Sequence, residues 1–127
     1  MSHKPVYTLL TTDSVLTGLG MTANTILGSS VQDSPEVRPF AVLKWADVTP
    51  AFTTGSSEIM QFWAYDEPGS YDNINSILKR VRAVLDENTD VEVDDERYST
   101  SKWNGDSAEL YDDIFKCIVR YATFTIV

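Results

Sequence analysis

A strand that runs through a tight turn into an amphipathic helix occupies the middle of the chain. Residues 58–65 are rich in Ile, Phe, Trp and Tyr, which favour strands with a half-buried surface. The Pro-Gly pair at 68–69 ends this strand, because proline donates no amide hydrogen and glycine is free to turn. Apolar residues then recur at every third or fourth position. This spacing predicts a helix over about 70–86 with one buried stripe.

The two ends of this helix carry suitable residues. Ser70 is placed to cap the first turn, because its hydroxyl can accept an exposed backbone amide. Asp72 lies where the helix dipole favours negative charge. The apolar stripe, which we expect to face a sheet, comprises Ile74, Ile77, Leu78, Val81, Val84 and Leu85.

The flanking segments predict a small α+β domain. Apolar residues at 5–20 predict one helix or two short ones, since Thr11, Thr12 and Asp13 weaken the middle. Residues 28–38 read as a loop and 103–106 as a turn. We expect strands over 25–27, 40–48, 56–65, 91–103 with a bend at 94–96, and 110–126, the last with a bulge or bend left open. The short connection between 40–48 and 56–65 indicates an antiparallel hairpin. The sequence therefore predicts a single domain over 1–127, with a mostly antiparallel sheet and two helices packed on one face.

Several predicted strands are apolar on both faces. Met60 and Phe62 point to one side of their strand, whereas Trp63 and Tyr65 point to the other. Two helices cover only one face of a sheet. The second face is then either an exposed patch of the kind that marks contact with another chain, or it is covered by a loop such as 28–38.

Net charge limits the partners of the chain. Its 127 residues carry a formal net charge of −9 and include one cysteine, Cys117, so no internal disulfide forms. A strongly acidic chain lacks the basic footprint of a protein that binds the DNA backbone, but it suits a surface past which DNA moves without sticking. No apolar run approaches the roughly 20 residues that span a membrane.

The candidate chemical groups predict no catalytic, cofactor or metal site. The acidic run Asp94, Asp95 and Glu96 lacks the alternating spacing of a calcium loop, and we interpret it as a solvated loop or an acidic lumen surface. Cys117 alternates with apolar residues and is most simply a core residue, and His3 is far from it in sequence.

Large aromatic residues give the candidate contact positions. Tryptophans can stack on nucleic-acid bases, but no basic groove accompanies them in this sequence. We therefore interpret them as packing or interface residues. Trp45, Phe52 and Trp63 are the candidates for contact with a neighbouring subunit or partner.

Four ordered blocks resemble one known family. They are RPFAVLKW at 38–45, WAYDEPGSY at 63–71, the helix at 74–85, and WNGDSAELYDD at 103–113. Together they are similar to the tail terminator proteins of siphophages, especially phages that infect actinobacteria. The resemblance covers nearly the whole chain from Val6 and is weakest over the acidic segment 91–96.

This resemblance implies a structural role in the virion, without enzymatic activity or cofactor. Such proteins form a ring, typically a hexamer, that caps the tail tube, stops its polymerisation and provides the surface that joins the head. The implied partners are further copies of the chain, the major tail tube protein and a head-completion or connector protein. We leave open that isolated subunits are monomers, because such contacts can be weak until the tube end brings several together. DNA passes through the ring without specific binding. The implied location is the tail–neck junction, after assembly in the host bacterial cytoplasm.

Two other classes of function stay open. One is a different neck component, such as a head–tail connector or head-completion protein, which shares the size and the ring habit. The other is a small α+β enzyme or ligand-binding domain with an apolar pocket between sheet and helix. The mass of the protein in solution would separate a ring from a monomer, and binding to tube or portal-side proteins would separate terminator from connector.

Overall fold

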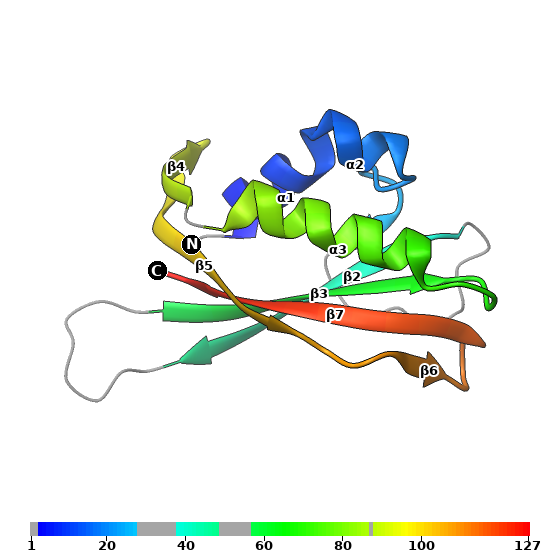
Figure 1. Cartoon of the computed structure of the whole chain (residues 1–127). Helices are drawn as coiled ribbons and strands as arrows, with labels where there is room; N and C mark the ends of the chain where they lie inside the picture. The colour runs from blue at the N-terminus through cyan, green and yellow to red at the C-terminus, as the bar shows by residue number, and fades with distance from the viewer. Residues whose placement is uncertain (1–2, 28–37, 49–56, 87) are drawn as a thin grey trace.

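The computed structural model describes residues 3–27, 38–48, 57–86 and 88–127. Within these ranges, three helices lie over one face of a single twisted sheet (Figure 1). The helices are α1 His3–Thr12, α2 Ser14–Gly18 and α3 Asp72–Leu85. The strands are β1 Ile26–Leu27, β2 Phe40–Val48, β3 Ser57–Asp66, β4 Asn88–Val93, β5 Glu96–Asp106, β6 Leu110–Asp112 and β7 Cys117–Ile126. The predicted α+β architecture is confirmed. None of the described helices has the length and apolar character needed to cross a membrane.

The sheet is mostly antiparallel. Its strand order is β1-β2-β3-β7-β5-β4, and β6 also pairs with β7. The long strands β2 and β3 form the predicted antiparallel pair, and β3 continues the antiparallel pairing with β7. The short β1 pairs parallel with β2. The two edges of the main path are therefore a two-residue strand and the six-residue β4.

Helix α3 packs its apolar stripe on the sheet as predicted. Ile74, Ile77, Leu78, Val81 and Leu85 are buried, and they share one core with Met60, Phe62, Ala122 and Phe124 of the sheet. The helix begins at Asp72, so its N-cap is Tyr71, which makes no side-chain capping bond, and not the predicted Ser70; the Ser70 hydroxyl accepts the Asp72 amide at 3.2 Å. The Ser101 hydroxyl donates to the Leu85 carbonyl and so fixes the other end of the helix on β5.

The N-terminal segment forms two short helices instead of one, and Asp13 is the reason. Its carboxylate accepts the Leu16 amide at 3.0 Å and caps α2, which ends α1 at Thr12. Val6, Leu10 and Leu16 are fully buried in the core that α3 shares.

The acidic segment forms a hairpin turn, which corrects the predicted single strand over 91–103. Strands β4 and β5 pair antiparallel, with Val93 opposite Glu96. Asp94 and Asp95 between them have φ of 49° and 66°. Two successive residues with positive φ form the kind of two-residue turn that matches the twist of a hairpin, and aspartate tolerates this conformation better than most residues.

The predicted turn at 103–106 is also wrong, and the strand over 110–126, which we left open to a bend, is two strands joined by a turn. Strand β5 continues to Asp106, with a bulge between Trp103 and Gly105, where Gly105 has a φ of 133°. The chain turns instead between β6 and β7, and this β6–β7 turn comprises residues 113–116. Gly105 thus forms part of a bulge inside a strand, which is a common place for glycine where a strand bends.

The second face of the sheet carries a small aromatic cluster. Phe40 and Tyr65 stack with ring centres 4.7 Å apart, and Phe115 from the β6–β7 turn packs edge-on against both. Phe40 is 1% exposed and Tyr65 is 4% exposed. The apolar second face is confirmed, but its centre is buried within the chain and is not the exposed patch that we considered. The alternative cover, residues 28–38, lies almost entirely outside the described residues.

Candidate interaction surfaces

The predicted aromatic contact residues do not share one surface. Trp45 is half-buried beside the core under the helices, where the His3 ring stacks on it at 3.8 Å. Trp63 packs against the cluster on the opposite face, stacked on Tyr121 at 4.3 Å, with the Lys44 ammonium 3.9 Å from its ring centre. Phe52 lies outside the described residues. A role for these three residues in subunit contacts stays a prediction.

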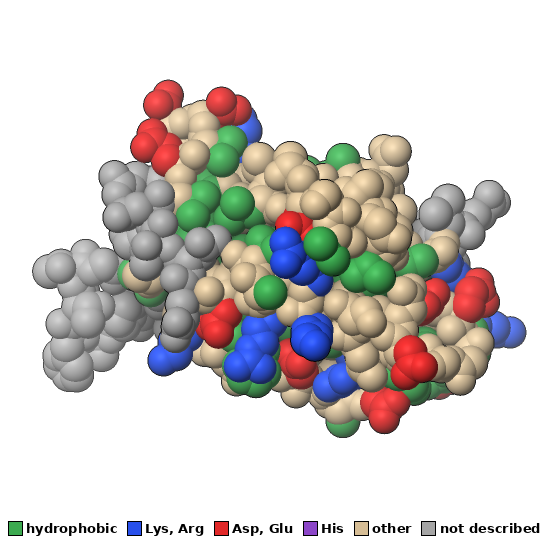
Figure 2. Space-filling model, turned by 45° about the horizontal axis from the view of Figure 1, so that its top comes forward, with side chains coloured by type: hydrophobic (Ala, Val, Ile, Leu, Met, Phe, Trp, Pro, Cys, Tyr) green, Lys and Arg blue, Asp and Glu red, His purple; other side chains and the backbone are tan. Residues whose placement is uncertain are grey.

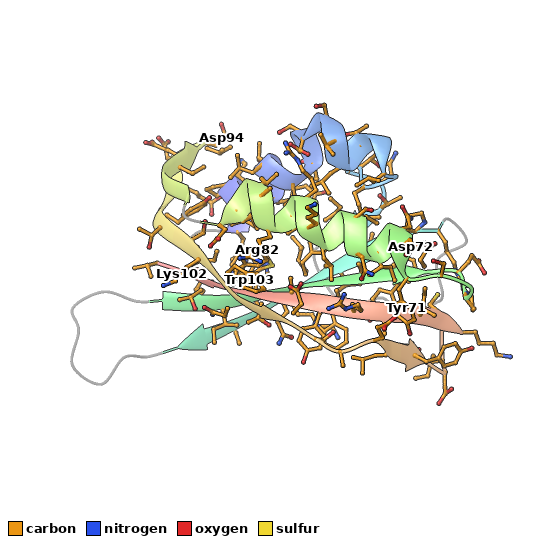
Figure 3. All side chains as sticks on the ribbon, in the orientation of Figure 1. Tyr71, Asp72, Arg82, Asp94, Lys102 and Trp103 are labelled. Carbon is orange, nitrogen blue, oxygen red and sulfur yellow. The ribbon has the colours of Figure 1, made fainter. Side chains whose placement is uncertain are left out.

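The β4–β5 turn presents the acidic run. Figure 3 shows Asp94 projecting from the end of the hairpin, away from the sheet. Lys4 of α1 lies 2.7 Å from its carboxylate and holds the pKa of Asp94 below its usual range. Asp95 is exposed and Glu96 is half-buried. No group of three or more His, Cys, Asp or Glu side chains suited to a metal ion occurs in the described part of the chain. The acidic lumen or loop surface formed by Asp94, Asp95 and Glu96 stays a prediction.

Positive charge gathers on the flank of α3 that faces β5 and β7. Figure 2 shows lysine and arginine side chains in this region, whereas carboxylates dominate the raised hairpin at the upper left. The Arg82 guanidinium lies 3.6 Å from the centre of the Trp103 ring, so both are engaged within the chain (Figure 3). Arg120 donates to Asn75 of α3 and to the Ser107 carbonyl. Arg82 thus covers one face of the Trp103 ring, as in a packing role for this tryptophan.

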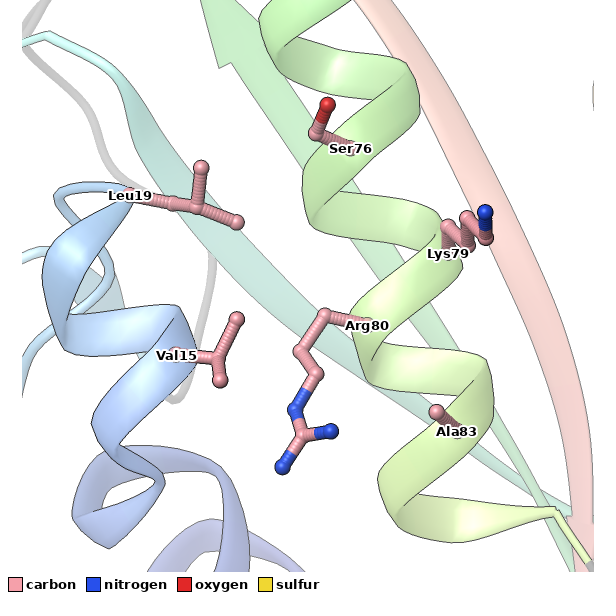
Figure 4. A pocket seen from close by; sticks show the side chains of 6 residues that line it. All are labelled: Val15, Leu19, Ser76, Lys79, Arg80 and Ala83. Atoms are coloured by element: carbon pink, nitrogen blue, oxygen red, sulfur yellow. The ribbon is translucent and has the colours of Figure 1, made fainter.

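A shallow groove runs between α2 and α3. Its volume is about 360 Å³, and its walls come from both helices (Figure 4). The lining residues are Val15, Leu19, Ser76, Lys79, Arg80 and Ala83. Arg80 spans the groove floor to Asp13, with N–O distances of 2.9 and 2.7 Å. We define the apolar part of this surface, Val15, Leu19 and Ala83, as the helix groove.

The β6 strand and its turn expose apolar side chains that sequence reasoning missed. Leu110, Tyr111 and Ile114 are 38%, 51% and 84% exposed. We define these three residues as the β6 tip. The sequence assigned them to one long strand, in which alternate residues would be buried. The signal that could have revealed the turn is Asp112-Asp113, two adjacent carboxylates inside an otherwise apolar run.

Cys117 is the core residue that the sequence predicted. It is fully buried in the aromatic cluster, and its thiol donates weakly to the Phe115 carbonyl at 3.5 Å. Burial raises the pKa of the Cys117 thiol, and it raises the pKa of neighbouring Tyr65 to about 12. A reactive thiol needs a lowered pKa and solvent access, so this environment suits packing.

Comparison with known proteins adds one finding on the fold. No model of a protein family matches the chain, and no curated protein matches it either. A solved structure does match. It is a chain from the virion of a native gene transfer agent particle, with a TM-score of 0.72 and 15% sequence identity. The match covers 98% of this chain and 91% of the other. At this identity the likeness shows a shared fold.

Proposed function

We propose that this chain is a structural virion protein, a tail terminator that caps the tail tube and provides the surface to which the head is joined. The observation that carries the proposal is the fold shared with a gene transfer agent virion chain over nearly the full length of both chains. The four sequence blocks at 38–45, 63–71, 74–85 and 103–113, which resemble tail terminators, support the narrower role.

The proposed mechanism needs no chemical step. A ring of identical subunits, proposed to be a hexamer, occupies the growing face of the tube and blocks addition of the next tube subunit. Its other partners are the major tail tube protein and a head-completion or connector protein. The net charge of −9 supports passage of DNA without binding, since few cations would release counterions from the phosphates. The proposed location is the tail–neck junction of the virion.

Deletion of the gene from its phage tests this role. Without the cap, tails should overgrow and should not join filled heads, and electron microscopy of lysates measures both effects. Complementation with the unaltered chain should restore tail length. Complementation with Ile77→Asp should not, because Ile77 is fully buried under α3. Normal-length tails attached to heads in the deletion strain would contradict the terminator role.

A second candidate role is that of a head–tail connector or head-completion protein. The same fold match supports it, because the matching chain comes from a virion and the match does not indicate a position within that virion. Pull-down with purified tail tubes and with portal-side proteins separates the two roles. A terminator should bind the tube end in substoichiometric, ring-sized amounts. A connector should bind the portal side and leave the tubes unaltered.

A further inference from the structure

The exposed large apolar side chains of the described ranges concentrate at two places. Three of the five form the β6 tip, and a fourth, Val15, lines the helix groove. The fifth, Val127, lies at the C-terminus. Scattered apolar residues need no explanation, and Leu110 and Tyr111, adjacent on β6, point to opposite faces. The protruding apolar side chain of the tip is therefore Ile114, and an apolar groove is the kind of site that receives such a side chain.

We propose that the β6 tip of one copy inserts into the helix groove of a second copy of this chain. This contact deepens the proposed function, because it would be the junction between neighbouring subunits of the ring. Ile114 is the anchor, since this residue is 84% exposed in the β6–β7 turn. Val15, Leu19 and Ala83 supply the apolar walls that receive it.

The tip is held in shape before any contact forms. The Asp112 carboxylate accepts the amides of Ile114 and Phe115, at 2.9 and 2.8 Å. Phe115 is packed into the buried aromatic cluster, and its carbonyl accepts a hydrogen bond from Arg38. These bonds fix the turn with Ile114 outward. A rigid anchor loses little conformational entropy on binding, which favours its use in recognition.

Charge also favours this pairing. Asp112 and Asp113 directly precede Ile114, whereas Lys116 lies two residues beyond it and Arg38 is already bonded to Glu67 and to the Phe115 carbonyl. The groove rim carries Lys79, which is exposed, whereas Arg80 is already bonded to Asp13. Copies with a net charge of −9 repel one another, so a contact that brings Asp113 near Lys79 offsets part of that repulsion where the surfaces meet.

The two surfaces lie on different sides of the molecule. The β6–β7 turn is at the end of the sheet where α3 begins, and α2 lies on the outer side of the helix layer (Figure 1). A contact between different surfaces of identical subunits is head-to-tail, and it forms a ring when the rotation closes. One copy therefore donates a tip to one neighbour and receives a tip from the other.

Substitution of one residue on each surface tests the contact. Sedimentation equilibrium measures self-association at protein concentrations up to about 1 mM, at which contacts with millimolar dissociation constants are populated. Ile114→Asp and Ala83→Glu should each weaken self-association about tenfold or more, as expected when a central apolar contact is replaced by a charge. Val127→Asp is the matched control, an exposed apolar residue outside both surfaces, and should associate like the unaltered chain. All three positions are exposed, so thermal melts should stay within a few degrees of each other.

Mixing the two defective variants gives the sharper result. Ile114→Asp retains an intact groove, and Ala83→Glu retains an intact tip, so an equimolar mixture should form dimers with one sound junction and nothing larger. A cross-link test uses the same logic in a Cys117→Ser background. Chains with Ile114→Cys and chains with Ala83→Cys should form the mixed disulfide in excess over either homodimer.

Three results would overturn the contact: an unaltered chain that is monomeric at about 1 mM, variants that associate like Val127→Asp, or a mixture without dimers. The proposed function fails separately. If the contact forms as described but deletion leaves tail length normal, the terminator role is wrong and the contact stands. If deletion gives overgrown tails that Ile114→Asp fully corrects, the contact is wrong and the role stands.

Discussion

Arg80 of α3 donates two hydrogen bonds to the Asp13 carboxylate, at 2.9 and 2.7 Å, and the same carboxylate caps α2. One side chain thus ends α1, begins α2 and ties both to the central helix. Asp13 is largely shielded from solvent and Arg80 is partly exposed. The floor of the helix groove depends on this pair.

Asp13→Ala should destabilise the domain by about 1 kcal/mol, the usual loss when a helix cap is removed. Asp13→Asn should cost less, because asparagine still caps while the charge pair is lost. Urea denaturation measures both free energies of unfolding, with Ser14→Ala, an exposed neighbour, as the control. Equal losses for the two Asp13 variants would mean that the cap contributes nothing.

Because of the Asp13–Arg80 pair, we also expect the free energy of unfolding to fall at acid pH. The Arg80 hydrogen bond lowers the folded-state pKa of Asp13 below its usual value. In the unfolded chain the pKa of the Asp13 carboxyl is about 3.9. The stability that the Asp13–Arg80 pair contributes is therefore fully present above that pH, and it is lost as the pH falls through the lower pKa of the folded state. The stability difference between the unaltered chain and Asp13→Asn should therefore shrink on acidification. A difference that is constant from pH 7 to the acid transition would contradict this sign.

Ile77→Asp and Val81→Asp should each unfold the domain, because both residues are fully buried under α3 and a buried unpaired charge costs more than about 4 kcal/mol. Circular dichroism and thermal melts report the loss. Ser76→Asp, on the exposed side of the same helix, is the matched control and should fold. A soluble Ile77→Asp protein with a native-like cooperative melt would contradict the assigned buried face.

Cys117→Ala should keep self-association and lose on the order of 1 kcal/mol of stability, since it removes one buried sulfur from the aromatic cluster. Thiol alkylation should be slow in the folded chain and rapid after unfolding, because the thiol is buried and its pKa is raised. Loss of tail capping by a folded Cys117→Ala protein would instead indicate chemistry at this thiol.

The isolated protein should not retard duplex DNA in a gel at moderate salt. The surface with gathered cations, on the α3 flank, is largely engaged within the chain, as the Arg82–Trp103 and Arg120–Asn75 contacts show. A basic DNA-binding protein in the same gel serves as the positive control. Tight binding that weakens steeply with salt would contradict passive passage of DNA.

The hydrophobic periodicity of the sequence predicted correctly those helices and strands whose apolar residues are the ones buried in the structure. Strand β2 occupies the predicted 40–48, and α3 differs from the predicted 70–86 by only a residue or two at each end. Both elements have uninterrupted periodicity and clear ends. The β4–β5 hairpin and the strand through 103–106 were predicted wrongly for a different reason. Asp94 and Asp95 make a turn without glycine, and Asn104-Gly105 resembles a turn but lies in a strand, so pairing across the sheet decided both cases.

The candidate surfaces were less predictable than the fold. Alternation correctly placed Trp45 and Trp63 on strands, but only the strand register shows that they lie on opposite faces, with Trp45 opposite Met60 and Val42 opposite Trp63. Exposure of Ile114 depends on where β6 ends. The adjacent carboxylates Asp112 and Asp113 are the sequence sign of that point, but the apolar residues on both sides, with Phe115 packed inward, obscure it.

The edges of the sheet limit how this chain can aggregate. An open edge with free backbone groups invites another strand, and repeated addition gives fibres without a fixed length. Here the β4 edge carries Glu92 and ends at a charged turn, whereas β1 pairs with β2 only at Ala41 and Val42. The charged β4 edge opposes endless lateral stacking. The proposed cap of a tail tube would gain from this, because such a cap should not itself become a template for growth.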